Sequence, residues 1–498
     1  MKEINVKLIV VTVFVATFMA AIEGTIISTA MPTIVSSLNG LGIMNWIFSI
    51  YLLTSAVTVP IYGKLADLFG KKKIFIISTI IFVVGSTLCG FATSIEQMIL
   101  FRAIQGLGAG GIYPTSMTIV ADVFPYEKRA KIMGLLGTAW GIAGVAGPLV
   151  GGFFVDKLTW HWIFFINIPV GIATIVLIAI GLKEKVNVAK QQIDYWGALL
   201  FTSGLLCLLL ALQFYGEDLN VMNAQAFSLL VASVVIFVIF YFVEKRAADP
   251  IVPFELFKNR TILVGNLIAF LISAYVMGID VYIPMWMQGI RGHGATISGL
   301  ILAPLSVAWF TGSFIAGRLL VTIGNKRTIG IASIVLLLGG LMLSGFGIGT
   351  PEWQFALNSA VLGLGFGMIF TTTTVNVQDA VPATMVGTAT ASITLFRTVG
   401  QAVGLAVFGM IFNSLLLHNM GNAADDAINA SQMNQLISTH HLGNVAPALV
   451  GPLREILYQS LHFVYWSMLG FILISFALHF LLPSGLREPS QIKGSDPV

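Results

Sequence analysis

The feature of this sequence that most constrains its fold is a series of long apolar stretches. A hydrocarbon core about 30 Å thick is crossed by about 20 apolar residues in a helix. Only 10% of the 498 residues are charged, whereas a soluble domain carries about 25%. The stretches of sufficient length are residues 8–30, 43–65, 74–93, 97–120, 131–155, 162–181, 196–215, 225–244, 261–284, 297–319, 328–347, 354–377, 391–415 and 462–482. The sequence therefore predicts an all-α integral membrane protein with fourteen transmembrane helices.

The lysines and arginines orient these helices, because basic residues gather on the cytoplasmic side of a membrane. With the N-terminus in the cytoplasm, twenty-one of the 26 basic residues fall on the cytoplasmic side and three fall outside. The remaining two, Arg102 and Arg397, lie within spans. We therefore predict a multi-pass protein of the cytoplasmic (cell) membrane with both termini in the cytoplasm.

One connection, at about residues 416–461, is much longer than the others, and this topology places it outside the cell. It contains the pair His440 and His441, which lack further residues at metal-ligand spacing. We interpret this segment as an ordinary extracellular loop and predict no metal site.

Two stretches of the chain recur at matching spacing. The stretch 63–73 resembles 317–327, and the glycine series 106–110 resembles 363–367. The offset of the second pair carries Glu23, within the first predicted span, onto Asp280. Repeated halves with a site at their interface are a common plan of secondary transporters. We therefore predict a six-helix bundle at 1–190, two inserted helices at 191–250, and a second six-helix bundle at 251–498.

Several motifs carry a resemblance to a known family. Gly63–Lys73 resembles the cytoplasmic signature of the major facilitator superfamily, and Arg102–Gly108 resembles its helix 4 motif. Gly141–Gly152 is similar to the helix 5 motif associated with antiport. Ile22–Pro32 resembles the helix 1 motif of the fourteen-helix drug/proton antiporter branch, with Glu23 where aspartate is usual.

This resemblance implies the major facilitator fold, in which two bundles rock about a central cavity. It also implies a proton-coupled antiporter that exports lipophilic, cationic drugs or toxic compounds across the membrane in exchange for protons. The energy source would be a proton gradient, so no cofactor is expected. The resemblance does not fix the substrate.

Other functions are less consistent with the sequence. A nucleotide-driven pump needs a phosphate-binding loop, and no Gly-x-x-x-x-Gly-Lys-Ser/Thr stretch is present. No Ser/His/Asp convergence or His-Glu-x-x-His motif indicates an enzyme. Two alternatives stay open: a dedicated metabolite, peptide or lipid exporter on the same scaffold, and, more remotely, an intramembrane enzyme or sensor.

Three charged residues within spans are predicted to couple proton movement to transport: Glu23, Asp280 and Arg102. A charge at the centre of a membrane helix costs about 2.5–3.5 kcal/mol, so it is usually paired or lines a wet cavity. Glu23 and Asp280 can carry a proton or attract a cationic substrate. Arg102 stays charged and is expected to partner an intramembrane acid. A structural carboxyl at Glu23, a rim position for Asp280 and purely structural pairing of Arg102 are the competing interpretations.

The residues predicted to contact substrate combine these carboxylates with aromatic and amide side chains, because aromatic faces suit flat or cationic compounds. They are Glu23, Asp280, Tyr51, Gln105, Trp46, Tyr275 and Trp286. For Trp46 and Trp286, anchoring at the membrane interface is the alternative. Arg397 is expected to snorkel or to pack at a helix interface.

A further set of residues is predicted to control gating. Asp67, with Gly63, Gly70 and Lys72 beside it, is expected to form a latch at the cytoplasmic end of the second helix. The glycines of the fifth helix allow close helix packing, as small residues do in lipid. Gly147 and Pro148 within that series are therefore expected to serve packing and rocking.

Overall fold

The computed structural model describes residues 6–123, 126–182, 184, 194–217, 224–247, 250, 254–381, 385–421, 428–437 and 445–483. Within these ranges every regular element is helical, which agrees with the predicted all-α class. The elements of the first part are α1 (Val6–Ser37), η1 (Leu41–Ile43), α2 (Asn45–Phe69), α3 (Lys71–Gly90), α4 (Ile95–Val123), α5 (Tyr126–Lys157), α6 (Trp162–Phe165) and α7 (Asn167–Gly181).

The rest of the chain continues this pattern. Its elements are α8 (Tyr195–Glu217), α9 (Ala224–Glu244), η2 (Phe254–Lys258), α10 (Arg260–Met285), η3 (Trp286–Ile290), α11 (Ala295–Ile323), α12 (Asn325–Ser344), α13 (Glu352–Asp379), α14 (Val386–Gly421), α15 (Ala430–Leu436) and α16 (Pro447–His479). Across the described residues, twelve helical segments are long and apolar enough to cross a membrane. The long helices α4 and α5 are not among these twelve, so the count of fourteen spans stays a prediction.

The predicted loop at 416–461 is shorter than the sequence suggested. Helix α14 continues to Gly421, α15 is a short helix, and α16 begins at Pro447. Proline is favoured in the first turn of a helix, and the apolar residues that follow recur every three or four positions and bury one face of α16. His440 and His441 lie outside the described residues. No group of three potential metal ligands is found within the described ranges.

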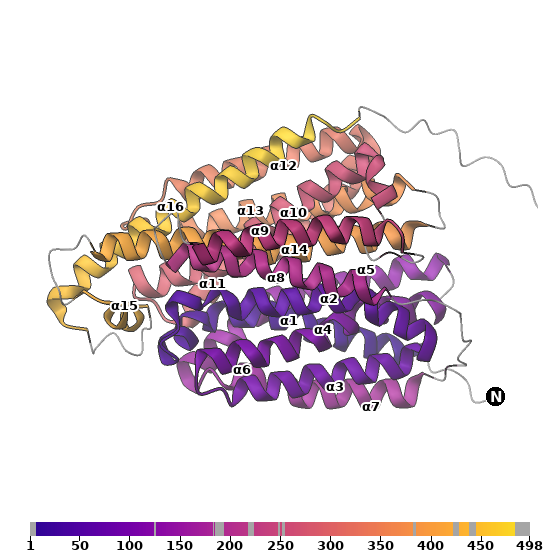
Figure 1. The fold of residues 1–498 in the computed structure, drawn as a ribbon, viewed down its shortest axis with the longest axis horizontal. Coiled ribbons are helices and arrows are strands. Elements are labelled where there is room, and N and C mark those ends of the chain that lie inside the picture. Colours follow the sequence, from indigo (N-terminus) through magenta and orange to yellow (C-terminus); the bar gives the residue numbers. More distant parts are fainter. Residues whose placement is uncertain are drawn as a thin grey trace, which may run out of the picture.

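The helices form two groups that are continuous in sequence (Figure 1). Helices α1 to α7 pack on one another, as do α10 to α16, and contacts of α1 with α10, α2 with α14 and α5 with α11 join the groups. Helices α8 and α9 pair with each other, and α8 also packs on α2 and α14. The predicted domain boundaries stay predictions, but this arrangement places the pair α8–α9 beside both groups.

Two glycines at matching places of the predicted repeat pack closely on a neighbouring helix. Gly108 of α4 lies against the backbone of Phe82 in α3, so closely that an added methyl group would collide with it. Gly365 of α13 lies close to Leu336 of α12, mainly to its side chain. These pairs occupy equivalent places in the two repeats, so each half uses a glycine to bring its third and fourth helices together.

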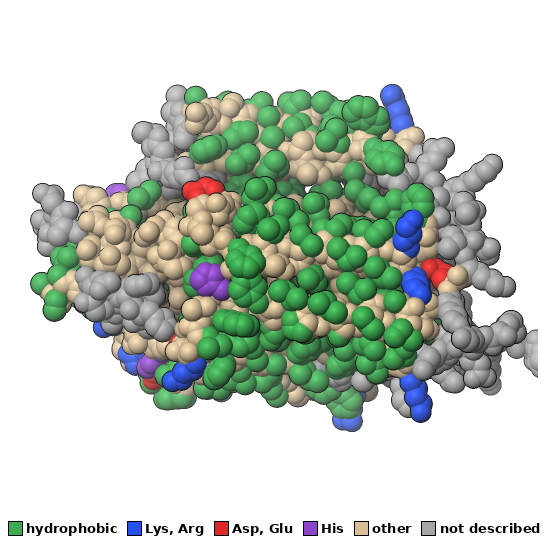
Figure 2. Space-filling view, turned by 90° about the horizontal axis from the view of Figure 1, so that it is seen from below, with side chains coloured by type: hydrophobic (Ala, Val, Ile, Leu, Met, Phe, Trp, Pro, Cys, Tyr) green, Lys and Arg blue, Asp and Glu red, His purple; other side chains and the backbone are tan. Residues whose placement is uncertain are grey.

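The surface suits a lipid environment. Figure 2 shows hydrophobic side chains over the middle of one face, with lysine and arginine side chains towards its ends. Exposed apolar side chains such as Val234, Phe310 and Leu338 occur in several of the long helices. A soluble protein rarely exposes so much apolar surface, so the chain is a multi-pass membrane protein.

The two groups are joined by hydrogen bonds at the end where α1, α5 and α10 finish. Gln288 Nε2 donates to the Thr29 carbonyl over 3.0 Å, and Tyr282 Oη donates to Asn45 Oδ1 over 3.3 Å. Asn413 Nδ2 donates to the Gly42 carbonyl over 2.5 Å. The Asp156 carboxylate accepts from the backbone N–H groups of Ala295 and Thr296 and from the Thr296 hydroxyl. At the same end, residues 26–36 of α1 and 281–290 of α10 and η3 are all buried. The structure is therefore closed at this end.

Candidate functional site

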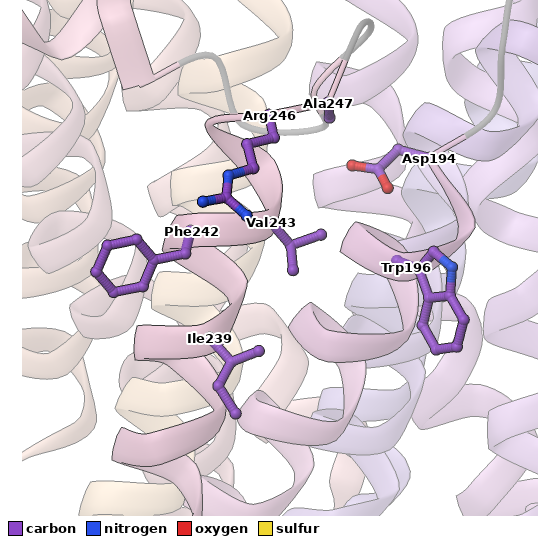
Figure 3. Close-up of a pocket in the computed structure, with 7 residues that line it drawn as sticks. All are labelled: Asp194, Trp196, Ile239, Phe242, Val243, Arg246 and Ala247. Atoms are coloured by element: carbon purple, nitrogen blue, oxygen red, sulfur yellow. The ribbon is translucent and has the colours of Figure 1, made fainter.

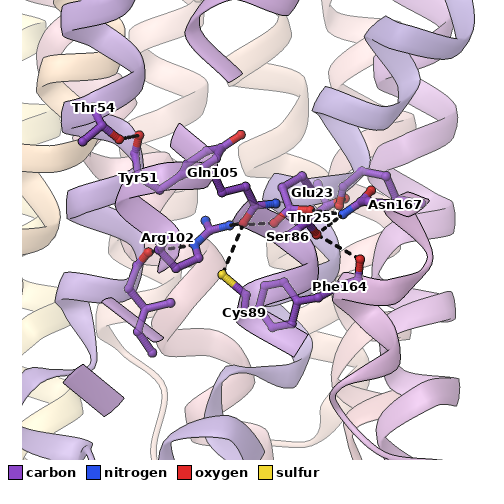
Figure 4. A network of polar contacts seen from close by, with 12 residues as sticks. Glu23, Thr25, Tyr51, Thr54, Ser86, Cys89, Arg102, Gln105, Phe164 and Asn167 are labelled. Carbon is purple, nitrogen blue, oxygen red and sulfur yellow. Dashed lines mark hydrogen bonds and ion pairs between the residues drawn. The ribbon is translucent and has the colours of Figure 1, made fainter. Parts of the chain in front are cut away.

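A buried ion pair lies within the first group of helices (Figure 4). Arg102 Nη1 of α4 donates to Glu23 Oε1 of α1 over 2.6 Å. The Glu23 side chain is 0% exposed and that of Arg102 is 1% exposed. Asn167 Nδ2, at the start of α7, donates to the other carboxylate oxygen over 2.7 Å. Both oxygens of Glu23 are thus satisfied without water.

Further groups hold the arginine. Arg102 Nε donates to the Ile47 carbonyl of α2 over 3.1 Å, and Nη1 also donates to Gln105 Oε1 over 2.7 Å. The guanidinium carbon lies 4.0 Å from the centre of the Tyr51 ring, which is a cation–π arrangement. The structure therefore brings together four of the predicted residues: Glu23, Arg102, Tyr51 and Gln105.

Sequence reasoning did not identify Asn167 or Ser86. Asn167 Nδ2 lies 3.0 Å from Ser86 Oγ of α3, and that hydroxyl donates to the Phe164 carbonyl over 2.9 Å. Asn167 is the only amide side chain within the predominantly apolar stretch 162–181. Polar residues in membrane helices usually face the protein interior, so this property could have marked it as a partner for an intramembrane charge.

Open space reaches α1 beside this network. Gly24, the next residue after Glu23, is exposed, and a methyl group added there would meet no atom within 4 Å. Glu23 itself is sealed, so its carboxylate has no solvent contact in this conformation. A proton can reach Glu23 only after the surrounding side chains move.

Asp280 has different surroundings. Its side chain, on α10, is half-buried, and it has no hydrogen bond or ion pair with any residue in the described ranges. The contact between Gln288 and Thr29 sets α10 beside α1, which puts Asp280 and Glu23 at similar depths along these helices, within about one turn. The two carboxylates are not joined, because Glu23 is bound inside the first group.

The structure does not bring the remaining aromatic candidates to the Glu23 network. Trp46 is half-buried and packs against the apolar cluster that α8 and α9 form with α2. Tyr275 is fully buried beside Phe366, with ring centres 5.9 Å apart. Trp286 is fully buried among the rings of Phe355, Tyr458 and Tyr465. Because Trp286 is enclosed within the second group, it is not a surface anchor in a membrane interface.

The predicted gating residues Gly70 and Lys72 lie at the junction of α2 and α3. Gly70 separates the two helices with a φ of 93°, which glycine adopts without strain. Lys72 Nζ donates to the Ala179 and Leu182 carbonyls at the end of α7, over 2.6 and 2.8 Å. A cation at a helix C-terminus is favourable. The surroundings of Gly63 and of the Asp67 side chain lie outside the described part of the structure, so the latch at Asp67 stays a prediction.

The second half has the same combination of a positive-φ glycine and a lysine that binds a helix end. Gly324 has a φ of 82°, and Lys326 Nζ donates to the Phe480 and Leu482 carbonyls at the end of α16, over 3.1 and 2.7 Å. In both halves, therefore, a glycine with positive φ precedes the third helix, and a lysine in the first turn of that helix binds the end of the last helix of the same half.

Replacing Lys72 by methionine should lower the free energy of unfolding by about 1 kcal/mol, because the last carbonyls of α7 lose their charged donor. The melting temperature of the purified protein in detergent measures this effect. The matched control is Lys73→Met, since Lys73 is exposed and lies 5.8 Å from the Phe69 ring. Equal shifts for both variants would contradict the role given to Lys72.

The glycines of α5 contact two other helices. Gly147 lies against Thr25 of α1, whose hydroxyl donates to the Ala143 carbonyl over 3.0 Å. On the other side, Gly299 of α11 lies so close to Pro148 that an added methyl group would be 2.6 Å from the proline carbonyl oxygen. Helix α5 thus joins the two groups by close backbone packing.

We expect Gly147→Ala to destabilise the protein by about 1–3 kcal/mol, because the methyl group must displace Thr25. Gly24→Ala adds the same methyl group to open space, and alanine favours the helix by about 1 kcal/mol. The two melting temperatures should therefore change in opposite directions. A fall of similar size for both would show that the contact with Thr25 is not responsible.

A pocket of about 430 Å³ lies elsewhere, at the end of the α8–α9 pair (Figure 3). Asp194, Trp196 and Arg246 line it together with apolar side chains of α9. None of the predicted site residues belongs to this pocket, so its size does not make it the transport site.

Comparison with known proteins identifies the family. The profile of the Major Facilitator Superfamily matches residues 13–405. The Multidrug transporter protein MdtP of Bacillus subtilis is 35% identical, over 95% of this chain and 92% of its own length. The Rubrofusarin-specific efflux pump aurT of Gibberella zeae is 32% identical, over 91% and 86% of the two chains.

Solved structures agree in fold. A bacterial homologue of the human lysosomal transporter Spinster, in an inward-facing and occupied conformation, aligns with a TM-score of 0.69 at 14% identity and covers 97% of each chain. A D-xylose–proton symporter aligns with a TM-score of 0.64 at 13% identity, over 96% of this chain and 98% of its own. With the sequence relatives, these similarities show that the chain belongs to the Major Facilitator Superfamily and is a membrane transporter.

Proposed function

We propose that this protein is a proton-coupled antiporter that exports lipophilic, cationic compounds across the cytoplasmic membrane by alternating access. The observation that carries the proposal is the sealed pair of Glu23 and Arg102. The names of the sequence relatives, multidrug transporter and efflux pump, support export. The proposal includes the fourteen-helix topology, with α4 and α5 also spanning the membrane. Both helices are long; α4 packs along α1, α2 and α3, and α5 packs along α1 and α11.

The buried pair supplies a mechanism for coupling. While Glu23 is ionised, its charge and that of Arg102 cancel in a site without water. Adding a proton to Glu23 leaves the Arg102 charge buried and uncompensated, which is strongly unfavourable. The pair must then separate or rehydrate, and both require α1 and α4 to move relative to each other. Protonation of one carboxylate thereby favours a different conformation of the bundle.

Asp280 supplies the attraction for a cationic substrate. Its carboxylate is half-buried and without a partner in the described residues, at the depth of Glu23. A cation bound there would gain a charge interaction that water screens only partly. The closed end of the molecule is the outer end in the proposed orientation, so this conformation is inward-facing and Asp280 would receive substrate from the cytoplasm.

Asp280→Asn should therefore weaken the export of cationic substrates about tenfold or more, and that of neutral lipophilic compounds much less. Transport assays with ethidium and with an uncharged dye of similar size measure this difference. Asp379→Asn is a suitable control, because Asp379 lies at the end of α13 away from the closed end. Equal effects on both dyes would place Asp280 at the rim of the cavity, without a role in charge recognition.

The proposal is tested with wild-type protein in vesicles, by imposing a proton gradient and following ethidium movement. Accumulation against its concentration gradient, abolished by a protonophore, is the expected result. Ethidium movement that ignores the proton gradient would reject proton coupling. A dedicated exporter of one natural compound is the second candidate, because one relative is described as a rubrofusarin-specific pump. Failure of all tested drugs to move would favour that candidate.

A further inference from the structure

Arg397 is a second intramembrane arginine, and its surroundings differ from those of Arg102. Arg397 Nη2, on α14, donates to the Phe370 carbonyl over 2.8 Å and to Thr374 Oγ1 over 2.6 Å, both on α13. Its guanidinium carbon lies 4.5 Å from the centre of the Phe370 ring. The expected packing at a helix interface is therefore present, but it occupies only one nitrogen of the guanidinium.

The other two nitrogens of the guanidinium have no protein partner among the described residues. Arg397 Nε is buried and has no hydrogen-bond partner among the described residues. Nη1 also has no partner there, and the Arg397 side chain as a whole is half-buried. No carboxylate pairs with Arg397 in the described ranges, whereas Arg102 is neutralised by Glu23. An unpaired charge within a membrane bundle usually marks a functional site.

The face of α14 that carries Arg397 does not point towards the helix pair α8–α9. Leu395, Val399 and Val403 pack towards α8 and α9. Arg397 lies about 200° around the helix from Leu395, beside the half-buried Thr394 and Gln401. This face therefore points away from α8 and α9, into the interior of the molecule.

Aromatic side chains surround the arginine. The ring of Trp309 on α11 stacks on Phe370, with centres 5.1 Å apart and an interplanar angle of 12°. From the other group of helices, Tyr113 of α4 is 37% exposed and lies near enough to Arg397 to sense its charge. Both halves of the transporter thus contribute to the surroundings of this cation.

The site is separate from Asp280. Gly400 and Gly404 of α14 pack on Phe270 and Ala274 of α10, so the two helices run side by side in the same direction. Arg397 lies one turn before Gly400, which places it about 20 Å from the level of Asp280 along α10. It is nearer the end where α10 and α14 begin. A small ligand cannot contact both charges at once.

We propose that Arg397, with Tyr113 and the Phe370–Trp309 stack, forms a binding subsite for aromatic carboxylates, nearer the end of the molecule where α10 and α14 begin. Nη1, which has no partner among the described residues, would donate a charge-assisted hydrogen bond to the carboxylate. The exposed ring of Tyr113 would contact the aromatic part. This inference extends the proposed export function to acidic and zwitterionic aromatic compounds.

The test is equilibrium binding of radiolabelled 2-naphthoate and 2-naphthamide to the purified full-length protein in detergent. The ligands differ in charge and have nearly the same shape. Wild-type protein should bind the carboxylate about tenfold more tightly than the amide. Arg397→Gln should abolish this preference, and Arg397→Lys should keep part of it. Equal binding of both ligands by wild type, or an unchanged preference in Arg397→Gln, would overturn the proposal.

Arg318→Gln is the matched control. Arg318 also lies 4.5 Å from a phenylalanine ring, that of Phe314, but it is exposed near the end of α11. Its replacement should leave the preference for the carboxylate unchanged. A loss of preference in this variant would show that surface charge, and not the Arg397 subsite, selects the ligand.

A second measurement does not depend on the folding of any variant. Phenylglyoxal modifies accessible guanidinium groups, and mass spectrometry locates the modified arginines of the wild-type protein. Arg397 should be modified, and 2-naphthoate but not 2-naphthamide should protect it. An unmodified Arg397, or equal protection by both, would contradict the subsite. Because no gradient is applied, failure of proton coupling would leave these results unchanged, and failure of the subsite would leave proton-driven ethidium transport intact.

Discussion

Replacing Glu23 by glutamine is expected to reduce proton-driven accumulation of ethidium in vesicles to the level of protein-free vesicles. Glutamine has nearly the same shape and can still accept a hydrogen bond from Arg102 or Asn167, which bind the two Glu23 oxygens at 2.6 and 2.7 Å. It cannot take up or release a proton. The change therefore removes the proposed coupling step and, as protonation would, leaves the Arg102 charge without its carboxylate partner.

The control for this prediction is Glu244→Gln. Glu244 is also a buried glutamate, 2% exposed, but it lies on α9, in the helix pair α8–α9 and away from Glu23. Its replacement should leave most of the accumulation. Uphill accumulation by Glu23→Gln at the wild-type rate would remove Glu23 from the coupling mechanism and leave a structural carboxyl as its role.

Replacing Arg102 by glutamine is expected to have the largest effect on stability. The change leaves the Glu23 carboxylate buried without its charged partner and also removes a donor to the Ile47 carbonyl. Breaking a buried ion pair costs about 3–5 kcal/mol in soluble proteins. We expect a loss of this order in unfolding titrations in mixed micelles, together with loss of transport.

The double variant Glu23→Gln/Arg102→Gln separates the two effects. With both charges removed, much of the lost stability should return, because no unpaired charge remains buried. Transport should stay absent, since no group in the pair can carry a proton. Additive losses of stability in the double variant would show that the 2.6 Å contact contributes no coupling energy.

The charged part of the site could be predicted from the sequence. Charges within apolar stretches are rare, so Glu23 and Arg102 were conspicuous, and the motif around Arg102 added Gln105. The structure brings these three together by hydrogen bonds. That Arg102 binds Glu23 and not Asp280 depends on which face of α1 meets α4, and one sequence does not specify helix rotation.

The aromatic candidates show where sequence reasoning fails. Because aromatic faces bind flat compounds, the sequence makes Tyr275 and Trp286 candidates, but both are fully buried among other rings in the second group. Residue type does not tell whether an aromatic side chain faces a cavity or a neighbouring helix. Asn167 was missed for the converse reason, because a single amide in an apolar stretch is a weak signal until its partner is known.

The helix boundaries were underestimated for a physical reason. Helices α1, α14 and α16 all extend beyond the predicted apolar spans. A hydropathy window ends where lipid contact ends, but a helix continues as long as it packs on the protein. The amphipathic first part of α16 buries Leu449, Leu453 and Leu457 against the second group, and so it replaces much of the predicted loop.

The measurement that tests proton coupling through Glu23 most directly is the release of protons when a substrate binds. Purified wild-type protein in weakly buffered detergent solution, at a pH where Glu23 is protonated in part, is mixed with ethidium while the pH is recorded. If a bound cation and a proton compete through Glu23, ethidium should release protons from the wild-type protein and none from Glu23→Gln. Equal release from both proteins, or release from neither while ethidium is bound, would contradict proton coupling through Glu23.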